Sequence, residues 1–147
     1  MSTSNSDDGK TFDVTILPGE NYDKAEFRLW LPDEPVTFRG VLVAVHGSNL
    51  DSRLWVRQSS WKEFAEHRNL NVCASYWQDI ALRHNLALLG CHLTDKPHEN
   101  MFIEEYCKVD KGSGQALLDA LADLAGQSGH SELSYAPLAF WGMSAGG

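Results

Sequence analysis

Alternating hydrophobic and polar residues near the start of the chain predict two strands joined by a turn. Residues 12–17 alternate and end at Pro18-Gly19, and residues 25–31 alternate again before Pro32. Such alternation is typical of strands with one buried face, and proline and glycine favour the turns that end them. We therefore expect an antiparallel strand pair at the N-terminus. The polar residues 1–11 are expected to form a disordered tail.

Longer apolar runs later in the chain predict strands that are buried on both faces. These runs cover residues 39–45, 86–91 and 136–140. Continuous apolar strands separated by helices are typical of parallel sheets. The sequence therefore predicts the α/β class, with a mostly parallel sheet and an antiparallel strand pair at the N-terminus. Residues 12–147 are expected to form one domain.

One helix is predicted before the last of these runs. Ser113 is a candidate N-cap, and Gly126 and Gly129 are candidate ends. The apolar positions that fall on one stripe of this helix are Leu117, Leu118, Leu121, Leu124 and Ala125.

The segment 51–75 is expected to be an insertion that is partly helical at residues 61–68. Residues 70–74 make a weaker strand than residues 86–91, because Asn71 interrupts them. Segments 61–72 and 77–88 share Trp, Ala, Asn and Leu at the same offsets. A local duplication and a chance similarity of two amphipathic segments both explain this pattern.

Charge and composition narrow the possible partners. The chain has 12 Lys and Arg against 20 Asp and Glu, a net charge of −8, which argues against nucleic-acid binding. It has no signal peptide and no apolar run long enough to cross a bilayer, so we expect a cytoplasmic protein without a membrane partner. The three cysteines, Cys73, Cys91 and Cys107, are odd in number, which favours reduced thiols.

Candidate chemistry begins at the C-terminal end of the chain. The apolar run 136–140 leads into Gly142-Met-Ser-Ala-Gly146, which fits the pattern Gly-x-Ser-x-Gly. A nucleophile elbow needs a strand that stops abruptly, a serine in a strained conformation and small neighbours. Ser144 is therefore a candidate nucleophile, and Gly142 and Gly146 are candidate supports of the elbow.

A second turn follows the run 39–45, where the strand leads into His46-Gly47-Ser48. Ligands of open α/β sheets bind beyond the carboxyl ends of the strands. A tetrahedral intermediate on Ser144 needs two donors for its oxyanion, and we expect the N–H groups of Ala145 and Ser48. Taken alone, His46-Gly47 is equally well explained as an ordinary turn that follows a strand.

The strand with His46-Gly47, the following helix and strand, and the strand with the Ser144 motif together resemble an α/β-hydrolase. The resemblance covers the amino-terminal half of such a protein, in the esterase and polyhydroxybutyrate-depolymerase-like branch. It implies hydrolysis of a small-molecule carboxylic ester without a cofactor. It also implies that Ser144 is the nucleophile and that Ala145 and Ser48 form the oxyanion hole, with His46 and Gly47 supporting the loop.

The chain departs from this family in one respect. The order implied by the resemblance places the acid and the histidine after the serine, where only residues 145–147 remain. We therefore expect an amino-terminal fragment that is inactive by itself and that self-associates through an unpaired apolar strand. The alternative is a non-catalytic α/β binding or structural protein in which residues 142–147 are only a turn.

Two further patterns are weaker signals. Cys91, His92, His98 and Cys107 suit zinc by residue type, but their spacing matches no tight zinc signature, so no metal site is predicted. Residues 111–114 precede the predicted helix and could hold an anion at its N-terminus. They lack the spacing of a phosphate-binding loop, which favours an ordinary helix start.

Overall fold

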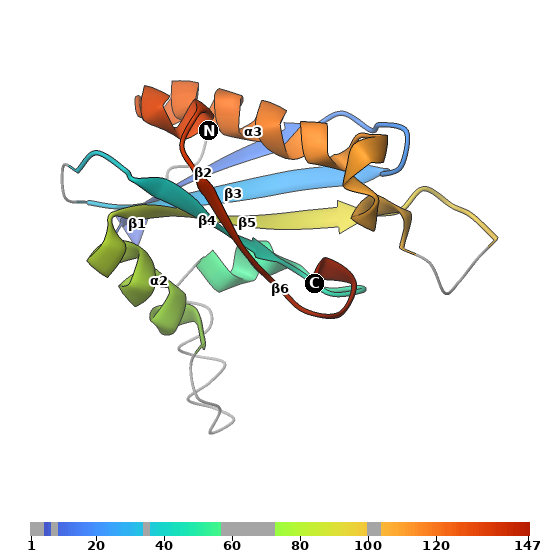
Figure 1. The fold of residues 1–147 in the computed structure, drawn as a ribbon, viewed down its shortest axis with the longest axis horizontal. Helices are drawn as coiled ribbons and strands as arrows, with labels where there is room; N and C mark the ends of the chain where they lie inside the picture. Colours follow the sequence, from blue (N-terminus) through green and yellow to red (C-terminus); the bar gives the residue numbers. More distant parts are fainter. Residues whose placement is uncertain (1–4, 7–8, 34–35, 57–72, 100–103) are drawn as a thin grey trace.

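The computed structural model describes residues 5–6, 9–33, 36–56, 73–99 and 104–147. Its centre is one sheet of six strands in the order β1-β2-β3-β5-β4-β6 (Figure 1). The strands are β1 Asn5–Ser6, β2 Gly9–Ile16, β3 Lys24–Pro32, β4 Gly40–Val45, β5 Leu86–Thr94 and β6 Leu138–Gly142.

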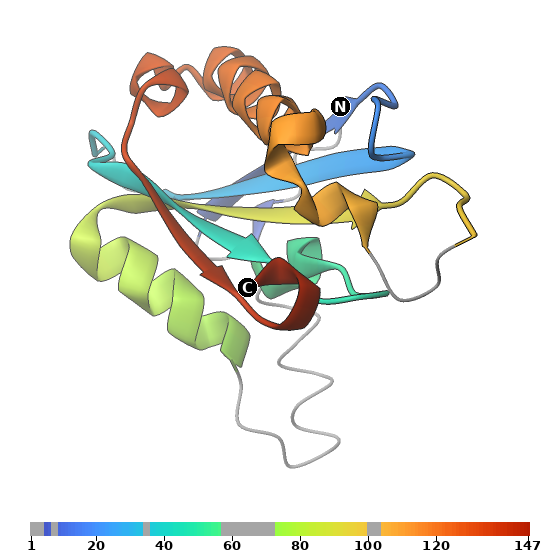
Figure 2. The ribbon, with the colours of Figure 1, turned by 45° about the vertical axis from the view of Figure 1, so that its right-hand side comes forward.

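Helices cover both faces of this sheet, as the turned view shows (Figure 2). Helix α3 (Ser113–Ser128) lies on one face, and helix α2 (Cys73–His84) lies on the other beside the short helix η1 (Ser52–Val56). The other short helices are η2 Glu105–Cys107, η3 Val109–Lys111, η4 Ser131–Ser134 and η5 Ser144–Gly146. This layering confirms the predicted α/β class.

The sheet has an antiparallel part and a parallel part. Strands β1 and β2, β2 and β3, and β3 and β5 pair antiparallel. Strand β4 pairs parallel with both β5 and β6. The antiparallel pair expected at the N-terminus is therefore present. The antiparallel part extends beyond that pair and the sheet is mixed, because β5 pairs antiparallel with β3 and parallel with β4.

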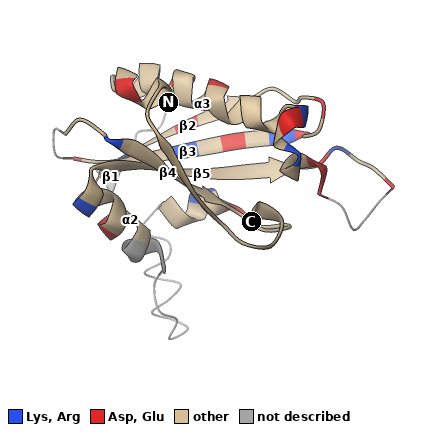
Figure 3. Cartoon of the chain, viewed as in Figure 1, with Lys and Arg blue, Asp and Glu red and all other residues tan. Residues whose placement is uncertain are grey.

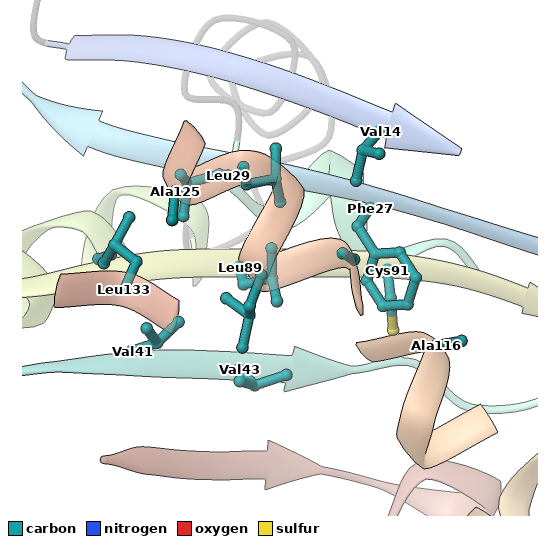
Figure 4. Packing of buried hydrophobic residues seen from close by; sticks show 14 of the residues in the cluster. Val14, Phe27, Leu29, Val41, Val43, Leu89, Cys91, Ala116, Ala125 and Leu133 are labelled. Carbon is teal, nitrogen blue, oxygen red and sulfur yellow. The ribbon is translucent and has the colours of Figure 1, made fainter. Parts of the chain in front are cut away.

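The core fills both faces of the central strands, as predicted for β4. On one face, Val41 and Val43 of β4 lie with Leu89 and Phe27 against α3 (Figure 4). On the other face, Leu42 and Leu88 pack with Trp30, Val56 and Ala81. Each fully buried aliphatic or aromatic side chain of this kind stabilises the fold by about 1.5–3 kcal/mol. Alternate residues of β4 thus anchor the strand from both sides.

Several boundaries differ from the prediction. Strand β2 begins at Gly9, inside the expected tail, because Gly9 pairs with Pro32 through the backbone whatever its polarity. Strand β5 extends to Thr94, and β6 is shifted to Leu138–Gly142. In the expected insertion 51–75, η1 and the start of α2 are described. Residues 61–68, and with them the first copy of the suspected duplication, lie outside the described residues.

Helix α3 corrects three details. Gly112 occupies the N-cap position with φ 129°, and no side chain caps the helix. Ser113 instead donates its buried hydroxyl to the Tyr106 carbonyl at 2.7 Å. Leu118 is 50% exposed, whereas Ala116 and Ala120 are buried, because small residues allow the helix to approach the sheet closely. Gly129 ends the helix in the left-handed conformation, and Gly126 lies within it.

Candidate active site

Two strands end side by side at the carboxyl edge of the sheet. Strand β4 pairs with β6, and the last pair joins Val45 to Gly142. Because the strands are parallel, the residues that follow them leave the sheet at the same end of the strands (Figure 1). A Cβ placed on Gly47 would lie 3.2 Å from the Cβ of Ser144, so the two turns are in contact. The sequence predicted that these two turns meet, and the structure places them together.

Ser144 has an unusual backbone conformation. Met143 is extended, with φ −144° and ψ 154°, and Ser144 then turns sharply with φ 55°. The left-handed region costs an L-residue other than glycine roughly 1–2 kcal/mol. Asparagine adopts it readily, but serine much less so, and such strained residues cluster at active sites. Ser144 is exposed at this corner.

The glycines around Ser144 are required by close packing. A Cβ on Gly142 would collide with the carbonyl oxygen of Gly146. A Cβ on Gly146 would lie 2.6 Å from the carbonyl oxygens of Val45 and His46. The turn is therefore pressed against the end of β4, and no side chain fits between them. This is the arrangement that a nucleophile elbow needs in order to raise its serine above the sheet.

Hydrogen bonds fix the rest of the elbow. The N–H of Gly146 donates to the Met143 carbonyl at 3.0 Å, and the N–H of Gly147 donates to the Ser144 carbonyl at 3.1 Å. The thiol of Cys107 donates to the Ala145 carbonyl at 2.8 Å, which ties the elbow to η2. Ser48 is exposed in the facing turn. The roles of Ala145 and Ser48 as oxyanion donors stay predictions.

His46 is fully buried beneath the two turns, with both ring nitrogens engaged. Its Nδ1 lies 2.7 Å from the Gly47 carbonyl, so Nδ1 carries the proton, and its Nε2 accepts the N–H of Leu93 at 2.9 Å. Burial lowers the pKa of His46 and outweighs the opposing effect of the Gly47 hydrogen bond. His46 is therefore a neutral residue whose hydrogen bonds join the end of β4 to β5.

Of the other described histidines, two pair with carboxylates, His84 is exposed at the end of α2, and Nδ1 of His92 is buried without a hydrogen bond. His98 is 2.7 Å from Asp95, and His130 is 3.0 Å from Glu132. Nδ1 of His92 lies 3.7 Å from Glu26 and 3.9 Å from Asp51. Among the residues that the structure describes, no histidine is hydrogen-bonded to Ser144.

A charged cluster, which the sequence did not reveal, anchors the turn after β4. Arg53 donates to both carboxylate oxygens of Asp51 and pairs with Glu26 of β3. Burial acts to raise the pKa of Asp51, but the hydrogen bonds from Arg53 outweigh it, so this pKa lies below its ordinary value. Buried Ser52 adds a second anchor, because its hydroxyl accepts the N–H of Cys91 at 2.8 Å.

Three of the four side chains considered for zinc have separate partners. Cys91 is buried against Ser52, Cys107 bonds to Ala145, and His98 pairs with Asp95. No group of three metal-binding side chains is gathered within the described part of the chain.

An apolar cavity of about 270 Å³ adjoins the elbow. We call it the apolar cavity. Its walls include Phe27, Val43, Leu117, Phe140 and Ala145. It lies on the side of the sheet that carries α3.

Fold and site thus define an α/β protein with a mixed sheet and a strained serine at the end of its outermost described parallel strand. No family model matches the chain, and no curated protein is significantly similar to it. The chain is similar to the solved structure of a cold-adapted esterase from an Arctic intertidal metagenomic library, with 14% identity and a TM-score of 0.44. It is also similar to a fluorophosphonate-binding serine hydrolase of Staphylococcus aureus, with 16% identity and a TM-score of 0.41.

Each match covers nearly all of this chain but only about half of the solved structure. The esterase match covers 99% of this chain and 57% of the esterase, and the Staphylococcus match covers 95% of this chain and 49% of that hydrolase. The chain therefore spans about half the length of the solved structures it matches. Separately, none of the described helices has the length and apolar character needed to cross a membrane.

Proposed function

We propose that this chain carries the nucleophile of a serine hydrolase of the α/β-hydrolase type that acts on carboxylic esters. The observation that supports the proposal best is the left-handed backbone of Ser144, two residues after the end of β6. A turn with only a structural role would favour glycine at such a position, because glycine pays no steric cost there. Strain retained at an exposed serine is expected where its hydroxyl has to be presented to a substrate.

The oxyanion hole of this proposal consists of the N–H groups of Ala145 and Ser48. Contact between Gly47 and Ser144 supports it, because the two turns then flank one reacting carbonyl. The loss of one such donor typically costs about 3–4 kcal/mol of transition-state stabilisation. In this arrangement the elbow supplies the nucleophile and the first donor, and the turn after β4 supplies the second.

The general base and its carboxylate partner lie outside the described residues in this proposal. The hydrogen bonds and carboxylate partners of His46, His98 and His130 support this assignment. Without a base, the Ser144 hydroxyl stays a weak nucleophile. We therefore propose that these 147 residues alone hydrolyse esters very slowly.

A fluorophosphonate probe with mass-spectrometric mapping tests this proposal. We expect slow formation of an adduct on Ser144, and we expect added imidazole to accelerate it by replacing the missing base. The Ser144→Ala variant should lose the adduct, whereas Ser134→Ala, which removes an exposed serine hydroxyl of another turn, should keep it.

Two results would contradict the proposal. Labelling of Ser144 no faster than that of other exposed serines would remove its role as nucleophile. Rapid labelling without imidazole would mean that a base within these residues already serves Ser144.

A further inference from the structure

A second cavity lies at the carboxyl ends of β4 and β5, and we call it the polar cavity. Its volume is about 340 Å³. Its walls come from the turn after β4, the end of β5 and the segment around η2. The lining residues used below are Asn49, Thr94, Asp95, Lys96, His98, Glu104 and Tyr106. Asn49 directly follows the proposed oxyanion donor Ser48, so this cavity adjoins the proposed reaction centre.

Tyr106 and His92 are the two wall residues of this cavity that have a buried polar atom without a hydrogen bond in the described part of the chain. Tyr106 is the more deeply buried of the two. It is 4% exposed, and its hydroxyl has no hydrogen-bond partner within the described part of the chain. Burial of the hydroxyl raises the pKa of Tyr106 above its ordinary value, so the group stays protonated and can donate. A buried hydroxyl without a partner is costly, and native proteins rarely keep one without a reason. Tyr106 is a wall residue of both cavities.

The wall that carries Tyr106 is held firmly in place. Asp95 accepts the N–H groups of Glu105 and Tyr106, both at 2.8 Å, and pairs with His98 at 2.7 Å. Asn21 adds hydrogen bonds from its side chain to the carbonyls of Glu105 and Lys108, each at 2.8 Å. A preorganised wall of this kind is what a binding site needs, because little order then has to be gained on binding.

The lining groups select the chemistry of a ligand. Lys96 faces a cavity that also holds Asp95 and Glu104, so charges of both signs line it and no single sign of ligand charge is selected. Asp95 is occupied by its own hydrogen bonds. The amide of Asn49 and the hydroxyls of Thr94 and Tyr106 can each both donate and accept. A neutral ligand with several hydroxyl groups matches such partners.

We propose that the polar cavity binds the alcohol part of the ester substrate, and that this alcohol is a neutral polyol of the glycerol or sugar kind. The proposal rests on the function proposed for Ser144. The Tyr106 hydroxyl would donate a hydrogen bond to a hydroxyl oxygen of the bound polyol. In the acylation step the Ser144 oxygen would bond to the acyl carbon and the ester C–O bond would break. The polyol would leave from this side of the two turns with the proton that the general base takes from Ser144, and water would then release the acid from Ser144.

The test compares binding of two butyrate esters that differ in their alcohol. Glycerol monobutyrate carries two free hydroxyl groups, and ethyl butyrate carries none. Saturation-transfer NMR titrations on the Ser144→Ala chain give dissociation constants without turnover. We expect glycerol monobutyrate to bind at least tenfold more tightly, and free glycerol to compete with it.

Matched tyrosine variants locate the site. Tyr106→Phe should remove most of the tenfold preference. It should not lower the midpoint of thermal unfolding in the free chain, because the hydroxyl it removes has no partner there. Tyr135→Phe, at a 77% exposed position, should leave both properties unchanged.

The outcomes separate this proposal from the hydrolase proposal. The polyol site would be overturned if the two esters bound equally well. It would also be overturned if the Tyr106→Phe variant kept the full preference for glycerol monobutyrate over ethyl butyrate. Selective binding that depends on Tyr106, in a chain whose Ser144 resists the fluorophosphonate probe even with imidazole, would support the polyol site and refute the nucleophile. Labelling of Ser144 without selective binding would refute only the polyol site.

Discussion

His46 links the candidate site to the pH dependence of stability. Its neutral ring bridges the Gly47 carbonyl and the Leu93 N–H, and its pKa in the folded chain is lowered by burial. The unfolded chain therefore binds a proton near pH 6.5 that the folded chain accepts only at lower pH. The stability that His46 contributes is complete above about pH 6.5 and is lost as the pH falls through its folded-state pKa.

This reasoning predicts the behaviour of a His46→Gln variant. In urea denaturation at pH 7.5, 6.5 and 5.5, the wild-type chain should lose stability as the pH falls. The variant should be less stable at pH 7.5 and should lose less on acidification. His84→Gln, at an exposed position at the end of α2, should retain the wild-type slope. A slope in His46→Gln equal to that of the wild type would exclude this assignment.

Gly146 shows how tightly the elbow is packed. A methyl group at this position would lie 2.6 Å from two carbonyl oxygens at the end of β4. We expect Gly146→Ala to lower the free energy of unfolding by about 1–3 kcal/mol, as overpacking usually does. Gly126→Ala is the matched control, because nothing lies within 4 Å of its added Cβ and it sits inside α3.

The control should change stability in the opposite direction. Alanine in a helix interior is favoured over glycine by about 0.5–1 kcal/mol. Thermal unfolding followed by circular dichroism measures both variants. If Gly146→Ala were as stable as the wild type, the elbow would not be pressed against β4 as the structure has it.

At the scale of elements, η1 is joined to the sheet by one buried hydroxyl. Ser52 accepts the N–H of Cys91 at 2.8 Å and donates to the carbonyl of Ala44 or Cys91, at 2.7 and 2.9 Å. Ser52→Ala leaves these buried groups without their partner, which typically costs about 1–3 kcal/mol. Ser134→Ala, with an exposed hydroxyl, should cost much less. Urea denaturation of both variants checks the difference, and equal losses would contradict the role of Ser52.

The strands could be predicted from the sequence because their signals are local. Alternating residues predicted β2 and β3, and continuous apolar runs predicted β4 and β5. The hydrophobic pattern of consecutive residues is enough to indicate such strands and which of their faces are buried. The insertion of β5 between β3 and β4 could not be predicted, because it depends on contacts between residues far apart in the chain. Leu118 was misplaced because a helix stripe alone does not reveal how closely small residues such as Ala120 let α3 approach the sheet.

Only the part of the candidate site that has a sequence motif, the sharp turn at Ser144, could be predicted. Gly-x-Ser-x-Gly after a strand predicted the sharp turn at Ser144, and the parallel ends of β4 and β6 bring it to Gly47. The hydrogen bond from Leu93 to His46 and the unpartnered hydroxyl of Tyr106 left no such trace. Both arise from tertiary packing between separate elements, so no local pattern encodes them.

At the scale of the whole molecule, one edge of the sheet, formed by β6, is both apolar and uncharged. Strand β6 is the last described strand in the sheet order. Neither β6 nor the turn that follows it carries a charged residue (Figure 3). Phe140 is 59% exposed, Trp141 37% and Met143 49%. Soluble proteins usually protect such a strand with charges or a covering segment, because its free backbone groups pair readily with another chain.

We therefore expect the 147-residue chain to self-associate through β6, and Phe140→Lys to shift it toward the monomer. The lysine places like charges opposite each other when two β6 strands pair. Leu118→Lys adds the same charge at a 50% exposed position on α3 and should leave association unchanged. Because each chain carries a net charge of −8, repulsion opposes association, and added salt should strengthen it by screening. Light scattering over a range of concentrations measures the mass, and a monodisperse monomer in high salt would rule out this interface.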